Sequence, residues 1–455
     1  MTIKSALFGG AFAAISLAAM PVVHAQSSLG PHLLPWGAEQ GASADGLVPA
    51  YAGGIDAIPN LPAAGPDIGY PNPFANEKPL FTVTAGNMAQ YSALLTDGEK
   101  ALLQRYPDEF QMPVYPSHRT IVYPQWFQQN SLRNATTAQE VGDSGDGFTN
   151  AFGGVPFPVP KDGYQAMWDA QTYYHPAYCH ETSNNYMVDA SGTVTDLGVL
   201  DQRYIVSFYD PNATSLPNSF FRYLYVRYLT PPSKAGSSFF FQFSNNYQAS
   251  DQITWFYDPG TRRVRLAPEF KYDTPVASYG GAIDYDEIGL FNGRMNKFDF
   301  KLLGKKEIIL PYNDYGIAST TVDALLGPHT VKPDQIRWEV HRVWEIEATL
   351  KPGARHKFSK WDFFVDEDDL NFSTTQAYDH AGNIYRVNFY IPYSSYGGVG
   401  GPSNMTQGAM YYDMTQGVYV MAEVHTTSKK YWDCQANMPN MSNFTPQALA
   451  AQGVR

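Results

Sequence analysis

A short apolar or aromatic run that ends in an aspartate, with Gly, Thr or Asn close by to reverse the chain, occurs five times in this sequence. The aspartates are Asp189, Asp258, Asp366, Asp379 and Asp413. An aspartate at the start of a turn accepts hydrogen bonds from the backbone two residues further on, and glycine supplies the positive φ that a reversal needs. Each unit therefore predicts a β-hairpin, and together they predict one large antiparallel meander.

The segment 336–350 gives the clearest strand pattern. One face carries Ile336, Trp338, Val340, Arg342, Trp344, Ile346, Ala348 and Leu350, and the other is mostly charged. A period of two sustained over such a length is typical of a strand. Arg342 interrupts the apolar face and needs a carboxylate or carbonyl partner there. His341 lies on the polar face beside Glu339 and Glu345; we interpret it as a surface histidine, with a proton relay as the alternative.

The period of two also predicts strands elsewhere, whereas the N-terminal part is helical or irregular. Further strands are expected over 222–229, 239–243, 252–257, 262–267 and 307–312. Residues 26–80 are dense in Gly, Pro and Ala and predict an extended, irregular arm. Helices are expected over 84–95, from the capping box Thr96–Glu99 to Tyr106, and over 163–172. The tail from Gln435 onward predicts a loosely ordered segment.

The first 25 residues have the pattern of a secretory signal. Lys4 is followed by an apolar run, and Val23-His-Ala25 is an A-x-A-like cleavage site before Gln26. The run is shorter than the about 20 apolar residues that a membrane-spanning helix needs. We therefore expect an exported, soluble protein. In an oxidising compartment the two cysteines, Cys179 and Cys434, suggest one disulfide, the alternative being two buried thiols.

Composition argues against a nucleic-acid partner. The net charge is −12, from 31 Lys and Arg against 43 Asp and Glu, and no basic cluster interrupts the acidic sequence. Aromatic residues make up 15% of the chain. Such side chains suit pleated, half-buried surfaces, and they also supply apolar contact area for a ligand.

Motifs of known chemistry are missing from the sequence, so we expect no catalytic residues, no metal site and no cofactor. It has no G-x-S-x-G, H-E-x-x-H or Cys-x-x-Cys motif. The cluster from His175 to Glu181 could supply metal ligands, but a disulfide at Cys179 is the preferred interpretation. Asp143 to Gly147 and Asp366 to Asp369 are read as turns rather than calcium loops. Gly397 to Gly401 is read as a flexible loop rather than a phosphate cradle.

The tryptophan stripe of segment 336–350 has two interpretations. Trp338 and Trp344 either belong to the core or line a cavity for an apolar ligand, since such sites are concave and mostly apolar. Arg342 in the middle of the stripe favours the second, because a buried cation there would meet an acidic head group. We therefore assign ligand binding to Trp255, Trp338, Arg342 and Trp344.

Several blocks of this chain are familiar together from one bacterial family. They are Leu34-Pro-Trp-Gly-Ala-Glu-Gln-Gly-Ala-Ser-Ala-Asp-Gly46, Glu77-Lys-Pro-Leu-Phe-Thr-Val-Thr-Ala85, Ala151-Phe-Gly-Gly-Val-Pro-Phe-Pro158, Tyr257-Asp-Pro-Gly-Thr-Arg-Arg-Val264, residues 268–275 and 295–312, and His341-Arg-Val-Trp-Glu-Ile-Glu-Ala-Thr-Leu-Lys-Pro-Gly353. From Leu34 to Glu423 the chain resembles domain-of-unknown-function family 1329, often labelled outer-membrane lipoprotein-sorting protein.

The resemblance implies a fold and a location. The fold is α+β but mostly β, a large curved antiparallel sheet in the form of a half-barrel like the lipoprotein carriers LolA and LolB, with helices on its concave face. On this reading residues 1–25 are the signal peptide, 26–80 the arm, 81–434 a single half-barrel domain with N-terminal helices, and 435–455 the tail. The mature protein would be periplasmic, with cleavage near Ala25.

The resemblance also implies a function. Relatives are commonly encoded beside hydrophobe exporters of the resistance-nodulation-division type and beside an outer-membrane β-barrel. We therefore expect a periplasmic carrier or accessory protein, not an enzyme, that binds a lipid or other hydrophobic molecule and works with an envelope transporter. The alternatives are an enzyme acting on an envelope or hydrophobic substrate, and a structural adaptor of a transport complex; fold alone does not decide between them.

Overall fold

The computed structural model describes residues 29–216, 218–397, 404–425 and 432–452. The signal peptide expected over 1–25 lies outside these residues, as does most of the glycine loop from Gly397 to Gly401. Between residues 29 and 80 the regular structure is limited to one 3-10 turn and isolated bridges. Among the described residues, no helix is both long and apolar enough to cross a membrane.

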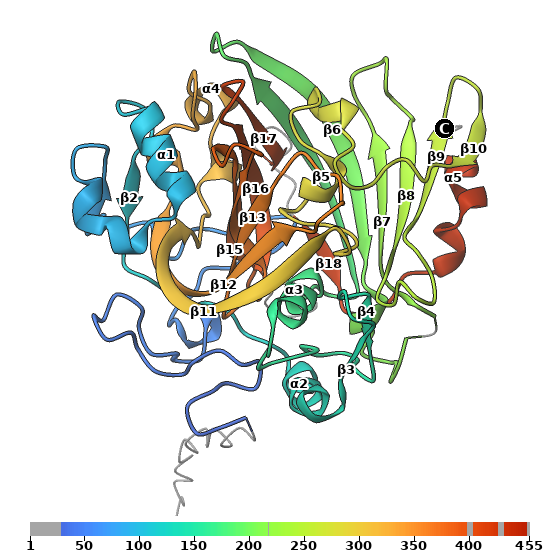
Figure 1. The fold of residues 1–455 in the computed structure, drawn as a ribbon, viewed down its shortest axis with the longest axis horizontal. Coiled ribbons are helices and arrows are strands. Elements are labelled where there is room, and N and C mark those ends of the chain that lie inside the picture. The colour runs from blue at the N-terminus through green and yellow to red at the C-terminus, as the bar shows by residue number, and fades with distance from the viewer. Residues whose placement is uncertain (1–28, 217, 398–403, 426–431, 453–455) are drawn as a thin grey trace, which may run out of the picture.

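Most strands belong to one sheet of 16 strands (Figure 1). Its order is β1-β2-β12-β13-β14-β15-β16-β17-β5-β6-β7-β8-β9-β10, with β11 beside β12 and β18 beside β5. Neighbouring strands are antiparallel except at the single parallel pairing of β2 with β12. The strands are β1 (Phe81–Val83), β2 (Met112–Val114), β5 (Tyr178–Val188), β6 (Val194–Ile205), β7 (Phe220–Tyr228), β8 (Ser238–Ser244), β9 (Ile253–Asp258), β10 (Arg263–Leu266), β11 (Phe298–Pro311), β12 (Trp338–Leu350), β13 (Lys360–Asp366), β14 (Phe372–Tyr378), β15 (Ile384–Ser394), β16 (Asn404–Asp413), β17 (Val418–Val424) and β18 (Asp433–Gln435). A separate hairpin pairs β3 (Gln139–Val141) with β4 (Gly147–Thr149).

The five hairpins predicted from aspartate turns are confirmed. They join β5 to β6, β9 to β10, β13 to β14, β14 to β15 and β16 to β17, and every pair is antiparallel. In each turn the aspartate Oδ1 accepts a hydrogen bond from the backbone N–H two residues on. The pairs are Asp189 with Ser191 (2.8 Å), Asp258 with Gly260 (2.8 Å), Asp366 with Asp368 (2.9 Å), Asp379 with Ala381 (2.8 Å) and Asp413 with Thr415 (2.8 Å).

The helices are short and few. They are α1 (Asp97–Arg105), α2 (Gln125–Thr137), α3 (Gly163–Gln171), α4 (Val322–Leu325) and α5 (Pro446–Gln452). The 3-10 turns are η1 (Ile55–Ala57), η2 (Met88–Leu94), η3 (Ser207–Tyr209), η4 (Ala277–Tyr279), η5 (Tyr285–Glu287), η6 (Ile317–Ser319), η7 (Pro333–Gln335) and η8 (Met441–Asn443).

Two of the three expected helices form as predicted. The capping box of α1 is present, with Glu99 N–H donating to Thr96 Oγ1 and Thr96 N–H to Glu99 Oε2. The helix α3 occupies the predicted segment. The segment expected to be helical over 84–95 forms the 3-10 turn η2 instead. Its apolar side chains are only partly buried against the second core cluster. The helix α2 was not predicted.

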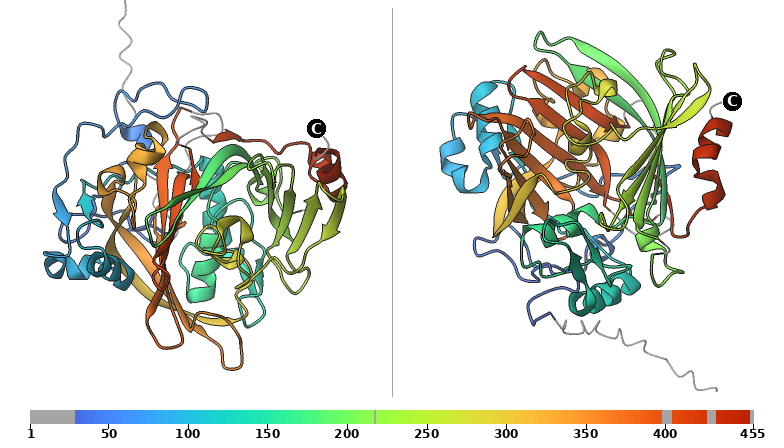
Figure 2. Two further views of the ribbon diagram at one scale, coloured as in Figure 1. Left: turned by 90° about the horizontal axis from the view of Figure 1, so that it is seen from above. Right: turned by 45° about the vertical axis from the view of Figure 1, so that its right-hand side comes forward.

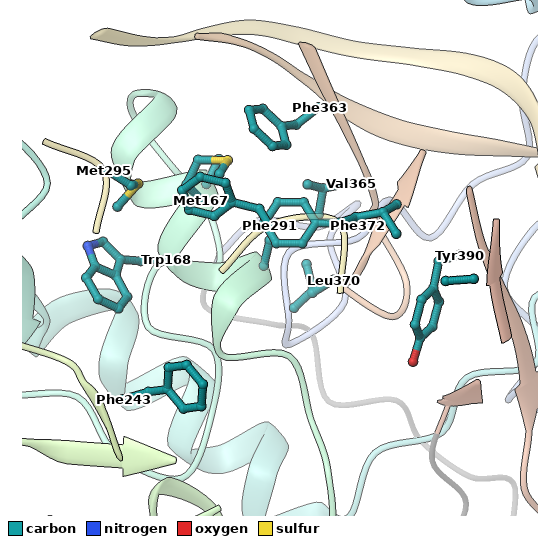
Figure 3. Packing of buried hydrophobic residues seen from close by; sticks show 14 of the residues in the cluster. Met167, Trp168, Phe243, Phe291, Met295, Phe363, Val365, Leu370, Phe372 and Tyr390 are labelled. Carbon is teal, nitrogen blue, oxygen red and sulfur yellow. The ribbon is translucent and has the colours of Figure 1, made fainter. Parts of the chain in front are cut away.

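The largest hydrophobic cluster contains the helix α3, strands from β11 and β12 across the sheet to β8, and the connection between β10 and β11. We call this connection the interior segment (residues 267–297); it passes between the two halves of the sheet (Figure 1). Figure 3 shows Phe291 of this segment between Met167 of α3 and Phe372 of β14. We call the face of the sheet that contacts this cluster the inner face. An irregular segment, rather than helices alone, thus fills the space along it.

The helix α1 lies on the opposite face of β15–β17. Leu102 and Leu103 of α1 belong to a second cluster with Phe389 and Met410, whereas their neighbours Tyr390 and Tyr411 belong to the inner cluster. The expectation that the helices share one face of the sheet is therefore met by α3 and not by α1.

The C-terminal segment is tied to the sheet by a disulfide. Cys179 of β5 and Cys434 of β18 are bridged, as the sequence predicted. Beyond it, Phe444 and Leu449 of the last turns pack on Tyr225 and Phe240, on the outer face of β7 and β8 (Figure 2). The tail was expected to be loosely ordered from Gln435; its described part, up to Gln452, instead forms η8 and α5, because these two apolar side chains are buried there.

Candidate functional site

An apolar cavity of about 50 Å³ lies between the inner face of β6–β8 and the interior segment. Alternation along the strands explains its walls, since every second side chain of β7 and β8 points to this face. The lining residues are Leu200, Gln202, Leu224, Val226, Tyr228, Phe239, Phe241, Phe243, Val276, Tyr279, Tyr285, Ile288, Asn292 and Glu423. Fourteen side chains thus line a space with a single ionisable carboxyl group among them.

The position of Glu423 follows from an irregularity in β17. The register of β17 against β5 shifts between Met421 and Val424, and Glu423 in this bulge has a left-handed φ of 58°. Asn185 of β5 holds the bulge, its Oδ1 accepting from the Glu423 N–H at 3.0 Å. Non-glycine residues in this conformation are uncommon and gather at functional sites. Regular alternation along β17 would point Glu423 away from the cavity. The bulge turns it toward the cavity instead.

A buried polar cluster surrounds this carboxyl group. Gln202 Nε2 donates to Glu423 Oε1 at 3.3 Å and to Glu181 Oε1 at 2.7 Å. On its other oxygen, Glu181 pairs with His425 Nε2 at 2.6 Å. Gln202 therefore links the carboxyl group at the cavity wall to an acid–histidine pair behind it.

Burial sets the protonation of the cluster. Burial, with a smaller contribution from Glu181, raises the pKa of Glu423 to about 8. Burial also raises the pKa of Glu181 well above its usual value and lowers the pKa of His425 to about 4. Glu423 and His425 are consequently neutral at pH 7, because the low-dielectric surroundings disfavour their charged forms. The cavity thus offers apolar walls and one protonated carboxyl group, an arrangement suited to an apolar molecule with a hydrogen-bonding end.

We expect Glu423→Gln to flatten the pH dependence of stability. A carboxyl group whose pKa rises from 4.5 to about 8 on folding keeps its proton in the folded state while the unfolded state loses it. Stability is therefore full below about pH 4.5 and falls as pH rises toward 8, by about 1.4 kcal/mol per pH unit for one fully linked proton. The amide has no such proton. Urea denaturation at pH 5 and pH 8 measures the effect. The same change in the free energy of unfolding between these pH values for the wild type and the variant would refute the assignment.

The four residues assigned to ligand binding from the sequence do not meet in this cavity. Trp338 is 1% exposed in the second core cluster, against Phe110 and Phe389. Trp255 of β9 lies on the outer face, in the cluster that contacts the C-terminal segment. Trp344 is half-buried, with Lys305 Nζ 4.4 Å from its ring centre.

Arg342 has the carboxylate partners that the sequence required. It donates to Glu367 at 2.9 Å and to Glu307 at 3.3 Å, and it lies 3.4 Å from Glu39 of the N-terminal arm. With Lys305 it lines a polar pocket of about 300 Å³. Its charge is thus met by carboxylates of the chain itself.

The interpretation of His341 as a surface residue is wrong. The side chain is 1% exposed, its Nε2 lies 2.9 Å from Glu339, and its ring stacks on Tyr312 at 3.7 Å. The charged face of β12 is covered because His118 and Asn313 pack over Glu339, donating to it from the His118 N–H (2.8 Å) and from Asn313 Nδ2 (3.1 Å). Dense charge on one strand face therefore marks a buried ion-pair network here.

The cluster from His175 to Glu181 is divided among separate contacts. Cys179 is in the disulfide, His180 pairs with Asp201 at 3.2 Å, and His175 stacks on Tyr204. Within the residues that the structure describes, no group of three or more His, Cys, Asp or Glu side chains is arranged to hold a metal ion.

Sequence reasoning missed Glu423. In the run from Val418 to Val424, simple alternation places it on the face of Tyr419 and Met421, which belongs to the second core cluster. A bulge has no local sequence signature at this position. The one available signal was a lone glutamate at the end of an otherwise apolar strand.

Comparison with known proteins adds family relatives. The family model described as "Protein of unknown function (DUF1329)" matches residues 82–450. An uncharacterised protein of Pseudomonas aeruginosa is 33% identical, with 97% of each chain covered. Similar solved structures include a DUF1329 family protein from Desulfovibrio piger (13% identity, 63% of this chain and 97% of that chain, TM-score 0.42) and a LolA superfamily protein from Nitrosomonas europaea (10% identity, 63% and 98%, TM-score 0.34).

Proposed function

Because this chain belongs to the DUF1329 family, a family of unknown function, we infer its role from its own structure. We propose that it is a carrier or accessory protein that binds a lipid or other hydrophobic molecule. The observation that carries this proposal is the apolar cavity between β6–β8 and the interior segment, with Glu423 on its wall. The molecule is taken up, sheltered from water and released without a chemical step.

The size of the cavity defines how binding works. At about 50 Å³ it is smaller than the cavity of about 150 Å³ that admits benzene in an engineered protein core. An acyl chain therefore enters only when the interior segment moves away from β6–β8. In this proposal the sheet then acts as a half-barrel, and the ligand takes the place of the interior segment against its inner face.

The ion pairs of the interior segment favour a movement of this kind. Asp284 pairs with Lys357 at 2.5 Å, Asp286 with His356 at 2.9 Å, and Glu287 with Arg386 at 3.2 Å. All three partners lie next to or within β13–β15, and none of them lines the cavity. The side chains that face β6–β8, such as Val276 and Tyr279, make apolar contacts. The segment is thus anchored along one side and can be displaced along the other by an apolar molecule.

The gain from ligand burial is sufficient for useful affinity. Burying one methylene contributes about 0.8 kcal/mol, so ten of them give about 8 kcal/mol before the costs of ordering are subtracted. That gross value corresponds to a dissociation constant near 1 μM, on the order expected of a carrier that must also release its ligand.

We further propose that the protein works in the periplasm, between an inner-membrane hydrophobe exporter of the resistance-nodulation-division type and an outer-membrane β-barrel. The disulfide between Cys179 and Cys434 supports an oxidising compartment. Deletion of this chain tests the partnership. We expect the exporter to deliver less of its substrate in the deletion strain.

Binding of dodecylphosphocholine below its micelle concentration tests the proposed function. Val226→Phe, which fills the cavity from β7, should weaken binding about tenfold. Val194→Phe is the matched control, because Val194 is exposed on β6 and lines no described pocket. Leu200→Phe repeats the test from another strand if the first variant folds poorly. Wild-type affinity in both cavity variants would refute the assignment of the site.

A further inference from the structure

A polar cleft of about 840 Å³ opens beside the ends of β7 and β8. Its walls come from α2, the β3–β4 hairpin, the connection before β7 and the residues that follow β8. Figure 1 shows α2, β3 and β4 gathered at this end of the sheet. A bridge between Gly147 and Asn246, and the bond from the Phe148 N–H to the Asn245 carbonyl oxygen at 2.9 Å, join the hairpin to the end of β8.

The cleft is lined mainly by uncharged hydrogen-bonding side chains. Asn, Gln, Ser and Thr dominate its walls, and among the described lining residues Arg133 is the only charged one. Hydroxyl and amide groups both donate and accept hydrogen bonds. A single cation in a chain of net charge −12 does not suit a polyanion. The chemistry that matches such walls is a neutral molecule with many donors and acceptors.

The walls are held in place by bonds within the protein. Thr137 Oγ1 donates to the Asn150 carbonyl oxygen at 2.8 Å, and Asn150 Nδ2 donates to Gln139 Oε1 at 3.2 Å. Across the cleft, Asn245 Nδ2 donates to the Phe148 carbonyl oxygen at 2.9 Å. Arg133 Nη2 is fixed on the Phe152 carbonyl oxygen at 2.8 Å. A frame of this kind reduces the ordering cost of binding.

A peptide fits this site less well than a saccharide. Extended peptides bind by adding a strand to a sheet edge or by filling apolar pockets. The cleft lies at strand ends rather than at an edge, and its apolar contribution is confined to Ala151, Phe152 and Leu216.

The cleft and the apolar cavity approach each other at the end of β8. Phe243 lines the cavity, and Asn245, two residues later along the chain, lines the cleft. Asn245 is the first residue after β8, and two residues of chain span at most about 7 Å. One molecule with an apolar tail and a hydroxyl-rich head could therefore reach both.

We propose that this cleft binds a neutral polyhydroxylated group, either a free oligosaccharide or the sugar head of an amphiphile. Binding of a free saccharide is independent of the proposed function, and only the amphiphile form rests on it. Maltohexaose, dodecyl maltoside and dodecylphosphocholine separate these cases, each titrated calorimetrically into the full chain below any micelle concentration.

We expect Ser215→Trp, which fills the cleft from an exposed position, to weaken binding of both saccharide probes about tenfold and to leave dodecylphosphocholine binding unchanged. Thr214→Trp should do the same from the neighbouring position. Ser233→Trp is the matched control, an exposed serine in the turn at the opposite end of β7 and β8.

The outcomes distinguish the two proposals. Tighter binding of dodecyl maltoside than of maltohexaose supports the sugar head of an amphiphile, and equal binding supports a free oligosaccharide. Absence of saturable binding of either saccharide overturns the inference, as does unchanged saccharide affinity in both cleft variants. The inference is also overturned if an uncharged hexapeptide of serine, asparagine and glycine displaces dodecyl maltoside as strongly as maltohexaose does. Failure of dodecylphosphocholine to bind refutes the proposed function alone.

Discussion

Arg386→Met is expected to lower the free energy of unfolding by about 3–5 kcal/mol, the range measured when one partner of a buried ion pair is removed. Arg386 is 1% exposed on β15 and bridges two buried carboxylates, Glu287 of the interior segment and Asp413 of the β16–β17 turn. Glu287 and Asp284, whose pKa burial raises to about 6, hold the segment against the sheet. Without the guanidinium, two buried charges lose their counter-ion together.

Urea denaturation followed by tryptophan fluorescence measures this effect. Arg263→Met is the matched control, because Arg263 is an exposed arginine on the edge strand β10, and it should change stability by about 0.5 kcal/mol or less. Arg386→Lys should fall between the two, since an ammonium keeps the charge and loses the planar fork. A loss below about 1 kcal/mol for Arg386→Met would show that the anchor of the interior segment lies elsewhere.

Removal of the disulfide is expected to cost about 3–5 kcal/mol, because the bridge closes a very long loop. Cys179 and Cys434 are separated by 255 residues, so the bridge removes many conformations from the unfolded chain. It also holds β18 against β5, which positions the C-terminal turns on the outer face of β7 and β8. The double variant Cys179→Ala, Cys434→Ala should therefore unfold at lower urea and expose its C-terminal segment to protease.

The wild type under strong reductant is the control for this prediction. It should match the double variant in stability, because both proteins lack the bridge. The reduced protein differs from the variant only in that it keeps both sulfur atoms. A reduced protein as stable as the oxidised one, with an unstable double variant, would assign the effect to packing of Cys179 rather than to the bridge.

The parts of the fold that the sequence predicted depend on neighbouring residues. The turn aspartates bond to the backbone two residues away, so Asp189 and Asp379 specify their hairpins whatever surrounds them. The same holds for the capping box of Thr96 and Glu99. Packing that arrives from far along the chain was not predictable in this way. His118 and Asn313 cover Glu339, the partner of His341, and the order of α5 depends on contacts with β8.

The candidate site was less predictable than the fold. The tryptophan pattern of segment 336–350 correctly indicated a strand, but the twist of β12 places Trp338 and Ile346, two residues of one nominal face, in different clusters. Glu423 reaches the cavity through a bulge that alternation cannot foresee. The interior segment has neither helical nor strand periodicity, and only the structure reveals that it lies between the halves of the sheet.

Native mass spectrometry of the protein purified from its own host tests the central claim most directly. We predict a retained hydrophobic molecule on the wild type, with its occupancy reduced in Val226→Phe and unchanged in Val194→Phe. An apolar adduct of equal occupancy in all three proteins, or wild type that carries none even after incubation with total lipid of the host, would contradict it.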